Sequence, residues 1–274
     1  MGLVLHIVDA FTNRRFAGNP AAVCFAEEGL TDEQMNHIAA EMNLSETAFL
    51  REAEGEWELR WFTPQTEVDL CGHATLAAAH ALWDTGRLAA ELQAVFLTRS
   101  GRLTVTRRGE WLDMDFPSEP AAAVTAPKEL IEALGLIPRF VGRNRMDYLV
   151  EVDSEQTVRT LAPDMSLLGR LETRGVIVTS LAADGGQPSS QASGYDFVSR
   201  AFFPAIGIDE DPVTGSAHCA LAPYWAKRLR KKELAGYQAS SRGGLVGMKL
   251  MGDRVLLSGQ AVTVLRGELD LSSE

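Results

Sequence analysis

The sequence carries one arrangement twice, and this internal repeat limits the folds open to the chain. The two copies are WFTPQTEVDLCGHATLAAAHALW from residue 61 and AFFPAIGIDEDPVTGSAHCALAPYW from residue 201. Each runs from a strand-like stretch through a proline and an acidic loop to a small-residue turn and an alanine-rich helix. Pro204 lies 140 residues after Pro64, and Gly215 lies 143 residues after Gly72. This agreement predicts a duplicated half-molecule, with two domains related by a pseudo-twofold axis.

The length predicts two domains or one large α/β unit, and the charge argues against nucleic acid as a partner. The chain has 274 residues, whereas single domains usually hold about 100 to 150. The net charge of −11 opposes binding to phosphate backbones, and the basic tract KRLRKKE at 227–233 is typical of a solvated helix end. Because the whole chain is acidic, an anionic substrate must be held by local dipoles and a few donors.

Cysteine spacing and hydropathy indicate the compartment. Cys24, Cys71 and Cys219 are widely separated and form no CxxC pair, so we expect neither a disulfide framework nor a structural zinc site. A reducing compartment fits this pattern best. The stretch LVLHIVDAF at 3–11 has no basic leader, and no window approaches about 18 uninterrupted apolar residues. We therefore expect a cytoplasmic protein without a membrane partner.

Residue periodicity predicts a strand-rich first half. Thr31 is the expected N-cap of a helix over 31–42, with Gln34 as its capping-box partner. A second, alanine-rich helix is expected over 73–86, closed by Gly86. Alternation of apolar and polar residues predicts strands at 3–11, 21–25, 47–51, 57–62, 101–106 and 110–116.

The second half follows the same scheme after a break. PSEPAAAVTAP at 117–127 disrupts both periodicities and is the expected linker between domains. The polar segment GGQPSSQASG at 185–194 is typical of a surface loop. Helices are expected at 128–134 and 215–230, and strands near 147–152, 175–181, 195–203, 245–250 and 254–266.

In both copies of the repeat a glycine stands where the alanine-rich helix begins. A helix N-terminus offers backbone N–H groups without helical partners and a partial positive charge, which together favour an anion. The amides around Gly72 and Gly215 therefore predict a site for carboxylate groups, and the implied ligand is a small carboxylated metabolite. The alternative is that both glycines only permit a tight turn and close helix packing.

Four segments together resemble the phenazine-biosynthesis PhzF-like family. They are VDAFTNRRFAGNPAAVCF at 8–25, EMNLSETAFL at 41–50, LRWFTPQTEVDLCGHATLAAAHAL at 59–82 and IDEDPVTGSAHCALAPYW at 208–225. These motifs are long, ordered and spread over most of the chain. They are therefore much more specific than a single glycine-rich turn.

The resemblance implies an α+β fold similar to that of diaminopimelate epimerase, with two α/β domains. Each domain of such proteins wraps a mainly antiparallel sheet around a central helix, here 73–86 and 215–230, and the active site lies in the cleft between the domains. Their final strand returns to the first domain. We therefore expect residues 261–274 to join domain 1–117, with 118–260 as the second domain.

The resemblance also assigns a proton-moving residue. In the family's NLSE motif the glutamate is the catalytic acid/base, and here it is Glu46. A carboxyl group whose pKa burial raises toward neutrality can give a proton to one carbon of a conjugated acid and retrieve another nearby. His73, in CGHAT, matches a histidine that orients the glutamate or binds a substrate carboxylate or amine. The alternative is that His73 only satisfies backbone groups at the helix start.

Residues of the second copy match the opposite wall of the family's site. Asp211 in EDPVTGSA is the implied third catalytic residue, engaging a substrate amine or the histidine. The alternative is a structural loop in which Thr214 and Ser216 are helix caps. The substrate-binding residues that the resemblance implies are Gly72, Ala74, Gly215 and Ser216.

One departure from the related epimerases bears on the reaction. Those enzymes use two cysteines, one per domain, because a single base does not readily invert a centre. Cys71 occupies the first position, but DPVTG replaces the second Cys-Gly-Thr-Gly turn, so Pro212 stands in place of the second thiol. Cys219 falls inside the helix and Cys24 in an apolar strand, where buried structural cysteines are common. One acid/base, Glu46, fits a proton shift without net inversion.

The expected activity is therefore a cofactor-independent isomerase acting on a small, carboxylated, partly unsaturated metabolite. We find no HExxH, Walker A or strand-linked GxGxxG motif, so no metal, flavin or nicotinamide is expected. Two alternatives stay open. One is a racemase or epimerase using Glu46 or Cys71 with another base, and the other is a non-catalytic small-molecule binding or interaction protein. The family resemblance also implies a homodimer.

Overall fold

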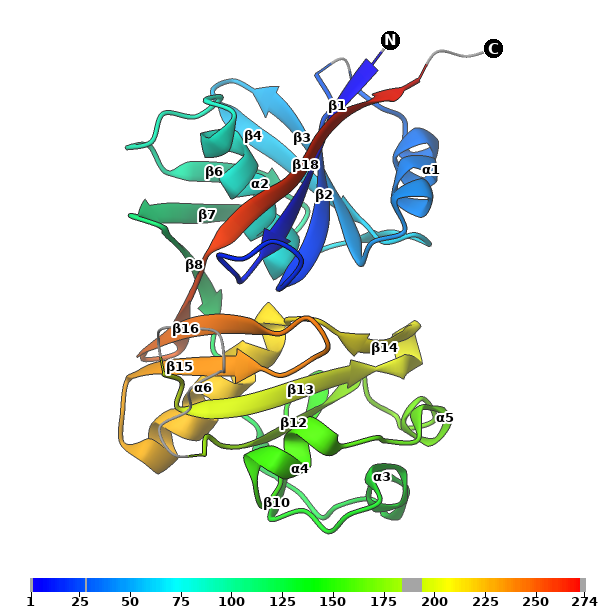
Figure 1. The fold of residues 1–274 in the computed structure, drawn as a ribbon, viewed down its shortest axis with the longest axis vertical. Coiled ribbons are helices and arrows are strands. Elements are labelled where there is room, and N and C mark those ends of the chain that lie inside the picture. Colours follow the sequence, from blue (N-terminus) through cyan, green and yellow to red (C-terminus); the bar gives the residue numbers. More distant parts are fainter. Residues whose placement is uncertain (1, 28, 184–193, 272–274) are drawn as a thin grey trace. The chain divides into compact units, whose positions relative to one another are not determined.

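The computed structural model describes residues 2–27, 29–183 and 194–271 (Figure 1). Its contacts divide the chain into two compact units. Unit 1 comprises Met1–Asp115 and Ser258–Glu274, and unit 2 comprises Phe116–Leu257. The loop expected at 185–194 lies, except for Gly194, outside the described residues.

Unit 1 is a mainly antiparallel sheet with two helices. Its sheet runs β18-β1-β2-β3-β4-β6-β7-β8, with β5 beside β4, and only the β2–β3 and β4–β6 pairs among these are parallel. The elements are β1 (Gly2–Ala10), β2 (Asn19–Phe25), α1 (Asp32–Met42), β3 (Glu46–Ala53), β4 (Glu56–Phe62), β5 (Glu67–Val68), α2 (Gly72–Asp84), β6 (Ala94–Thr98), β7 (Gly101–Arg108), β8 (Trp111–Pro117) and β18 (Ala261–Asp270).

The helix α2 is buried in unit 1, as the resemblance implies for a central helix. It contacts β1, β2, β3 and β18, while α1 packs against β3 and β4 on the other side of the sheet (Figure 1). Alanine dominates α2, and Ala74, Ala77, Ala78 and Ala81 are fully buried, so strands approach the helix closely. The observed helix, Gly72–Asp84, begins one residue before the expected span of 73–86 and ends two residues before the end of that span. Thr85 is its C-cap residue.

The C-terminal chain enters unit 1 through β18. This strand pairs antiparallel with β1 from Ala10↔Ala261 to Gly2↔Asp270, with a register shift after Ile7. The single strand expected at 254–266 is wrong, because β17 ends at Gly259 and β18 begins at Ala261. At Gly259 the backbone passes so close to the core that a Cβ would lie 2.5 Å from the Phe11 ring. The chain changes its strand partner at this point of close approach.

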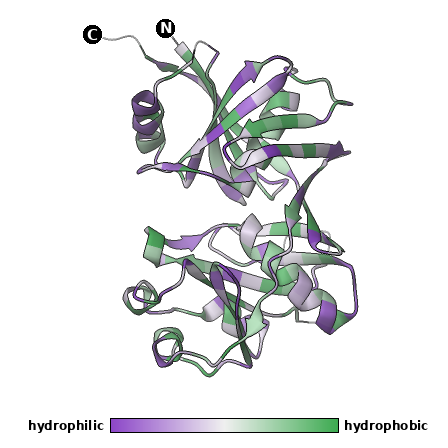
Figure 2. Cartoon of the chain, turned by 180° about the vertical axis from the view of Figure 1, so that it is seen from behind, coloured by the Kyte–Doolittle hydropathy of each residue, from purple (hydrophilic) through white to green (hydrophobic). Residues whose placement is uncertain are grey.

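The capping box expected at α1 is confirmed. The Thr31 side chain accepts from the Gln34 backbone N–H, and the Gln34 side chain accepts from the Thr31 N–H at 3.0 Å. Hydrophilic residues, purple in Figure 2, cover much of this helix, while Met35, Ile38 and Ala39 are buried against the sheet.

We expect Thr31→Ala to lower the free energy of unfolding by about 1 kcal/mol, because the bond from the Gln34 backbone N–H to the Thr31 hydroxyl at the start of α1 is lost. Urea denaturation followed by circular dichroism measures this change. Thr31→Ser, which keeps the hydroxyl, is the matched control and should lose only a fraction of that amount. Equal losses in the two variants would show that the hydroxyl contributes nothing.

Unit 2 repeats the plan with its own central helix. The pairs β11–β12 and β13–β15 are parallel, whereas β9–β10, β10–β11, β12–β13, β13–β14 and β15–β16 are antiparallel. The elements are β9 (Ala122–Ala123), α3 (Lys128–Leu134), β10 (Phe140–Arg143), β11 (Asp147–Glu151), α4 (Glu155–Thr160), α5 (Met165–Leu168), β12 (Gly175–Leu181), β13 (Phe197–Phe203), the short 3-10 helix η1 (Pro204–Ile206), β14 (Ile208–Asp211), α6 (Gly215–Leu229), β15 (Glu233–Gln238), β16 (Gly244–Met251) and β17 (Arg254–Gly259).

The core of unit 2 forms between α6 and its sheet. Trp225 is fully buried, stacks on Phe197 with ring centroids 5.7 Å apart and donates to Thr179 Oγ1 at 3.0 Å. Gly236 lies so close to this cluster that a Cβ would be 2.5 Å from the Phe197 ring. Within the described residues, no helix is long and apolar enough to cross a membrane.

Candidate active site

Unit 1 brings Glu46 and His73 together. Glu46 is the first residue of β3, and His73 is the second residue of α2. The Oε2 atom of Glu46 lies 3.3 Å from Nε2 of His73, and the two side chains are 14% and 6% exposed. A carboxyl group and an imidazole therefore share a largely dehydrated space at the start of a helix.

The contacts of His73 fix which nitrogen carries its proton. Burial lowers the pKa of His73 to about 3, so the ring is neutral at ordinary pH. Its Nδ1 lies 3.2 Å from Nδ2 of Asn19, and an amide nitrogen can only donate. Nδ1 is thus the acceptor, and by this assignment from the hydrogen-bond network the proton sits on Nε2, the atom next to Glu46.

Asn19 contacts His73, and the sequence patterns did not single it out. It is fully buried at the start of β2, opposite Ala10 of β1. The preceding Gly18 has φ +65°, and a Cβ there would lie 2.1 Å from the Ala10 carbonyl oxygen, so only glycine fits this turn. The GNP triplet at 18–20, within the segment that resembles the family, was the available signal.

Cys71 completes this half of the site. It is the N-cap residue of α2, and its Sγ lies 3.5 Å from His73 Nδ1. One ligand atom from each of Glu46, Cys71 and His73 lies within 4.8 Å of the others, a spacing that a metal ion such as Zn²⁺ could bridge. His73 Nδ1 is already engaged, because it lies 3.5 Å from Cys71 Sγ and accepts from Asn19.

Unit 2 holds Asp211 in a turn before α6. Asp211 ends β14 and is buried, and its Oδ2 accepts from the Thr214 hydroxyl at 2.5 Å. Gln238, fully buried at the end of β15, donates to the Asp211 carbonyl oxygen at 2.7 Å and accepts from the Thr214 N–H at 2.9 Å. One amide side chain therefore fixes both ends of the turn. Gln238 carried no signal in the sequence.

Replacing Gln238 by leucine should lower the free energy of unfolding by about 1 to 3 kcal/mol, because buried backbone groups of the 211–214 turn lose their partners. Urea denaturation of unit 2, followed by the fluorescence of the buried Trp225, measures the loss. Gln238→Glu keeps the acceptor oxygen but loses the Nε2 donor, and we expect it to bind the turn less well. A stability equal to the native protein in Gln238→Leu would contradict this role.

The hydroxyls near the start of α6 do not cap it. Thr214 is the N-cap residue but makes no side-chain cap bond, because its hydroxyl donates to Asp211. Ser216 Oγ accepts instead from NH2 of Arg174 at 3.0 Å. The alternative that these two side chains are helix caps is therefore wrong.

The two glycines of the repeat occupy equivalent positions. Gly72 and Gly215 are the first residues of α2 and α6, and in each case the N-cap residue is extended and forms no side-chain cap bond. Neither belongs to the described glycines with a positive φ, so a left-handed turn does not explain them. The backbone amides of the first helical turns, including those of Ala74 and Ser216, have no helical partner.

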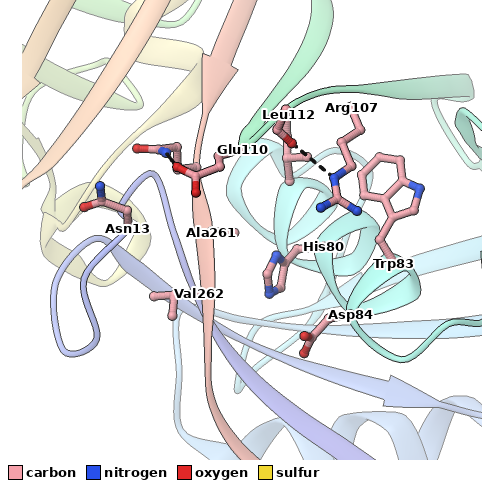
Figure 3. Close-up of a pocket in the computed structure, with 11 residues that line it drawn as sticks. Asn13, His80, Trp83, Asp84, Arg107, Glu110, Leu112, Ala261 and Val262 are labelled. Atoms are coloured by element: carbon pink, nitrogen blue, oxygen red, sulfur yellow. Dashed lines mark hydrogen bonds between the residues drawn. The ribbon is translucent and has the colours of Figure 1, made fainter. Parts of the chain in front are cut away.

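A separate cavity of about 460 Å³ lies in unit 1 (Figure 3). His80, Trp83 and Asp84 of α2 line it with residues of the β7–β8 hairpin and the start of β18, and neither Glu46 nor His73 takes part. Its polar side chains are largely engaged, since Asp84 accepts from Thr263 and Arg266, each shorter than 2.8 Å. We assign no function to this cavity.

These features define a class of protein. Two units each carry a mainly antiparallel sheet, a buried helix with an uncapped N-terminus and polar side chains beside it, which is the α+β architecture of epimerase-like proteins. A solved hydroxyproline epimerase from Agrobacterium vitis is similar in fold alone, with a TM-score of 0.64 and 13% identity over 99% of this chain and 93% of that one. The predicted fold class is confirmed.

The chain belongs to the phenazine biosynthesis-like (PhzC-PhzF) family, whose model matches residues 8–267. It is 57% identical to an uncharacterized isomerase of Halalkalibacterium halodurans, over 97% of each chain. A crystal structure of a PhzF family protein from Enterococcus faecalis is similar with a TM-score of 0.92 and 42% identity, over 99% of this chain and 100% of that one. The family resemblance is thereby confirmed, and an isomerase-type function is supported.

Proposed function

We propose that the protein is a cofactor-independent isomerase that moves a proton within a small, carboxylated, unsaturated metabolite, with Glu46 as general acid/base. The observation that carries this proposal is the contact between Glu46 Oε2 and His73 Nε2. The proton on Nε2 of the neutral imidazole lies beside this carboxylate oxygen, 3.3 Å away, so a small movement of either side chain would let Nε2 donate to it. The other carboxylate oxygen is then the one that exchanges protons with a substrate carbon.

The helix N-termini support the proposed substrate class. The first turns of α2 and α6 favour negative charge without a side-chain cap. In the proposed reaction, carboxylate groups of the substrate are bound by backbone amides, those of Gly72 and Ala74 in unit 1 and those of Gly215 and Ser216 in unit 2. Asp211 accepts from a substrate amine or hydroxyl group.

A proton shift agrees better with these residues than a two-base inversion. Pro212 stands where the second thiol of a two-cysteine epimerase would be, and Cys219 is buried within α6. Cys71 is the observation that favours the second candidate, a racemase or epimerase, because its Sγ lies near His73. Burial of Cys24 and Cys219 raises the pKa of both thiols, which makes them poor bases.

The test is proton exchange in heavy water across a panel of small unsaturated and amino carboxylates, comparing the native protein with Glu46→Gln. We expect deuterium to enter a conjugated carbon with the native protein only. Exchange confined to an α-carbon, with racemisation, would identify the second candidate instead. Binding without exchange for every compound, in both proteins, would support a non-catalytic binding protein.

We further propose a cytoplasmic homodimer. All three cysteines lie in the described residues, are buried and form no disulfide, which suits a reducing compartment. Sedimentation equilibrium measures the mass in solution directly. A mass equal to the 29.8 kDa chain at every concentration would rule out the dimer.

A further inference from the structure

Arg174 links a buried carboxylate to the start of α6. Its Nε donates to Asp147 Oδ1 at 2.9 Å, and its NH2 donates to Asp147 Oδ2 and, at 3.0 Å, to Ser216 Oγ. The Asp147 side chain is 0% exposed, whereas that of Arg174 is 29% exposed. A guanidinium group with a two-point partner is held rigidly, because the planar fork matches the carboxylate.

This contact determines what the Ser216 hydroxyl can do. A guanidinium group has five donors and no acceptor, so Ser216 Oγ must accept from Arg174. Its own proton then points elsewhere, and among the described residues Ser216 donates to no acceptor. Toward a ligand the hydroxyl can therefore act as a donor, and the neighbouring positive charge strengthens such a bond to an anion.

The ion pair with Asp147 does not require Ser216. Two bonds from Arg174 already satisfy both oxygens of the buried carboxylate. The third bond of Arg174, to Ser216 Oγ, lies at the uncapped N-terminus of the 15-residue helix α6. The positive charge of Arg174 is thereby added to that of the helix N-terminus.

The corresponding half-site of unit 1 has a different character. There the side chains beside the helix start are a neutral His73, the amide Asn19 and the carboxyl group of Glu46, and none of these carries a positive charge. The duplicated halves have thus diverged: one carries the proton-moving carboxyl group, and the other a fixed cation.

We propose that Arg174 is a positioning residue, held by Asp147, that makes the Ser216 hydroxyl a donor to a carboxylate of the substrate. This inference rests on the proposed function. It assigns a carboxylate-binding role to the start of α6 and leaves the role proposed for Glu46 unchanged. Arg174, the residue before β12, and Asp147, the first residue of β11, thereby set the substrate class.

The test uses benzoate and its neutral analogue benzamide as probes, with affinities measured by NMR titration. Arg174→Met alone would leave Asp147 buried and unpaired, so the variant is Arg174→Met with Asp147→Asn. We expect benzoate to bind the native protein at least tenfold more tightly than benzamide. The variant should lose about tenfold for benzoate and little for benzamide, as fits the loss of a charge-assisted bond.

A double-mutant cycle separates positioning from a merely structural role. Ser216→Ala should lose about as much benzoate affinity as the Arg174 variant, and combining the two should add almost nothing, because they disrupt one interaction. Arg145→Met, which removes an exposed arginine paired with Glu119 in the same unit, is the matched charge control and should bind benzoate as the native protein does. Near-ultraviolet circular dichroism checks that each variant is folded.

Several results would overturn the proposal. These are a native protein that does not distinguish benzoate from benzamide, a folded Arg174 variant with native selectivity, or additive losses in the cycle. If the Arg174 variant unfolds, Arg174→Lys replaces it. Lysine keeps the charge but cannot bind Asp147 and Ser216 together as the planar guanidinium group does. Native selectivity for benzoate in Arg174→Lys would also contradict the proposal. All these measurements leave Glu46 intact. If these measurements contradict the role of Arg174 while proton exchange still depends on Glu46, the proposed function stands. If exchange does not depend on Glu46 but the binding results are as expected, the role of Arg174 in carboxylate binding stands.

Discussion

Glu46→Gln should reduce the rate of proton exchange into the substrate by about 10²- to 10⁴-fold, the usual contribution of a positioned acid or base. Glutamine has nearly the same shape but cannot bind or release the proton. Because the Glu46 side chain is only 14% exposed and lies 3.3 Å from His73, the amide can occupy the same space. The melting temperature should change little.

Two controls make this measurement specific. Glu58→Gln on the neighbouring strand β4 removes an exposed carboxyl group that pairs with Arg51, and we expect native exchange rates from it. Prior dialysis against a chelator should leave the native rate unchanged, because the proposed proton transfer by Glu46 uses no metal ion. A rate that falls with chelation and returns with Zn²⁺ would instead identify Glu46, Cys71 and His73 as a metal site. Equal rates in the native protein and Glu46→Gln would refute Glu46 as the acid/base.

Stability should fall as the pH drops below about 6.5, because burial keeps histidines neutral in the folded protein, above all His73 and His218. Burial lowers the pKa of His73 to about 3 and that of His218 to about 4, against 6.5 for an exposed histidine. His218 is fully buried in α6 and its Nδ1 contacts the Thr214 carbonyl oxygen at 2.8 Å. A carbonyl only accepts, so Nδ1 carries the proton of this neutral ring.

The direction follows from proton binding. Between about pH 6.5 and 4 the unfolded chain protonates these histidines and the folded chain does not, so the unfolded state takes up more protons. The stabilising contribution is therefore complete above pH 6.5 and is lost as the pH falls toward the folded-state values. Each histidine contributes a slope of up to about 1.4 kcal/mol per pH unit.

Urea denaturation between pH 5 and 7 measures this slope, and the range avoids most carboxyl titration. His218→Leu removes one titrating group, so we expect the slope of unfolding free energy against pH to fall by the amount that corresponds to about one proton. The lost bond to Thr214 lowers stability at every pH. The slope, unlike the absolute stability, does not respond to lost packing. An unchanged slope in His218→Leu would show that His218 is protonated in the folded protein.

Local sequence patterns predicted the elements of this protein well where they depend on short spacing. The helix at 128–134 and the capping box at Thr31 have the expected positions, and α6 ends one residue before the expected 215–230. The strand break at Gln260 was missed because both flanking stretches alternate alike. It depends on how closely Gly259 approaches Phe11, which no local pattern encodes.

The sequence by itself determined the repeat, the alanine-rich helices and the glycines that begin them, because these follow from spacings of a few residues and from similarity between two segments. It indicated Glu46, His73, Asp211 and Ser216 only through family motifs. Only the tertiary structure decided which side chains meet. His73 contacts Asn19 across 54 positions and Ser216 contacts Arg174 across 42, because sheet register and helix packing bring them together. Such contacts set tautomer, charge and donor direction, and they leave no periodic trace along the chain.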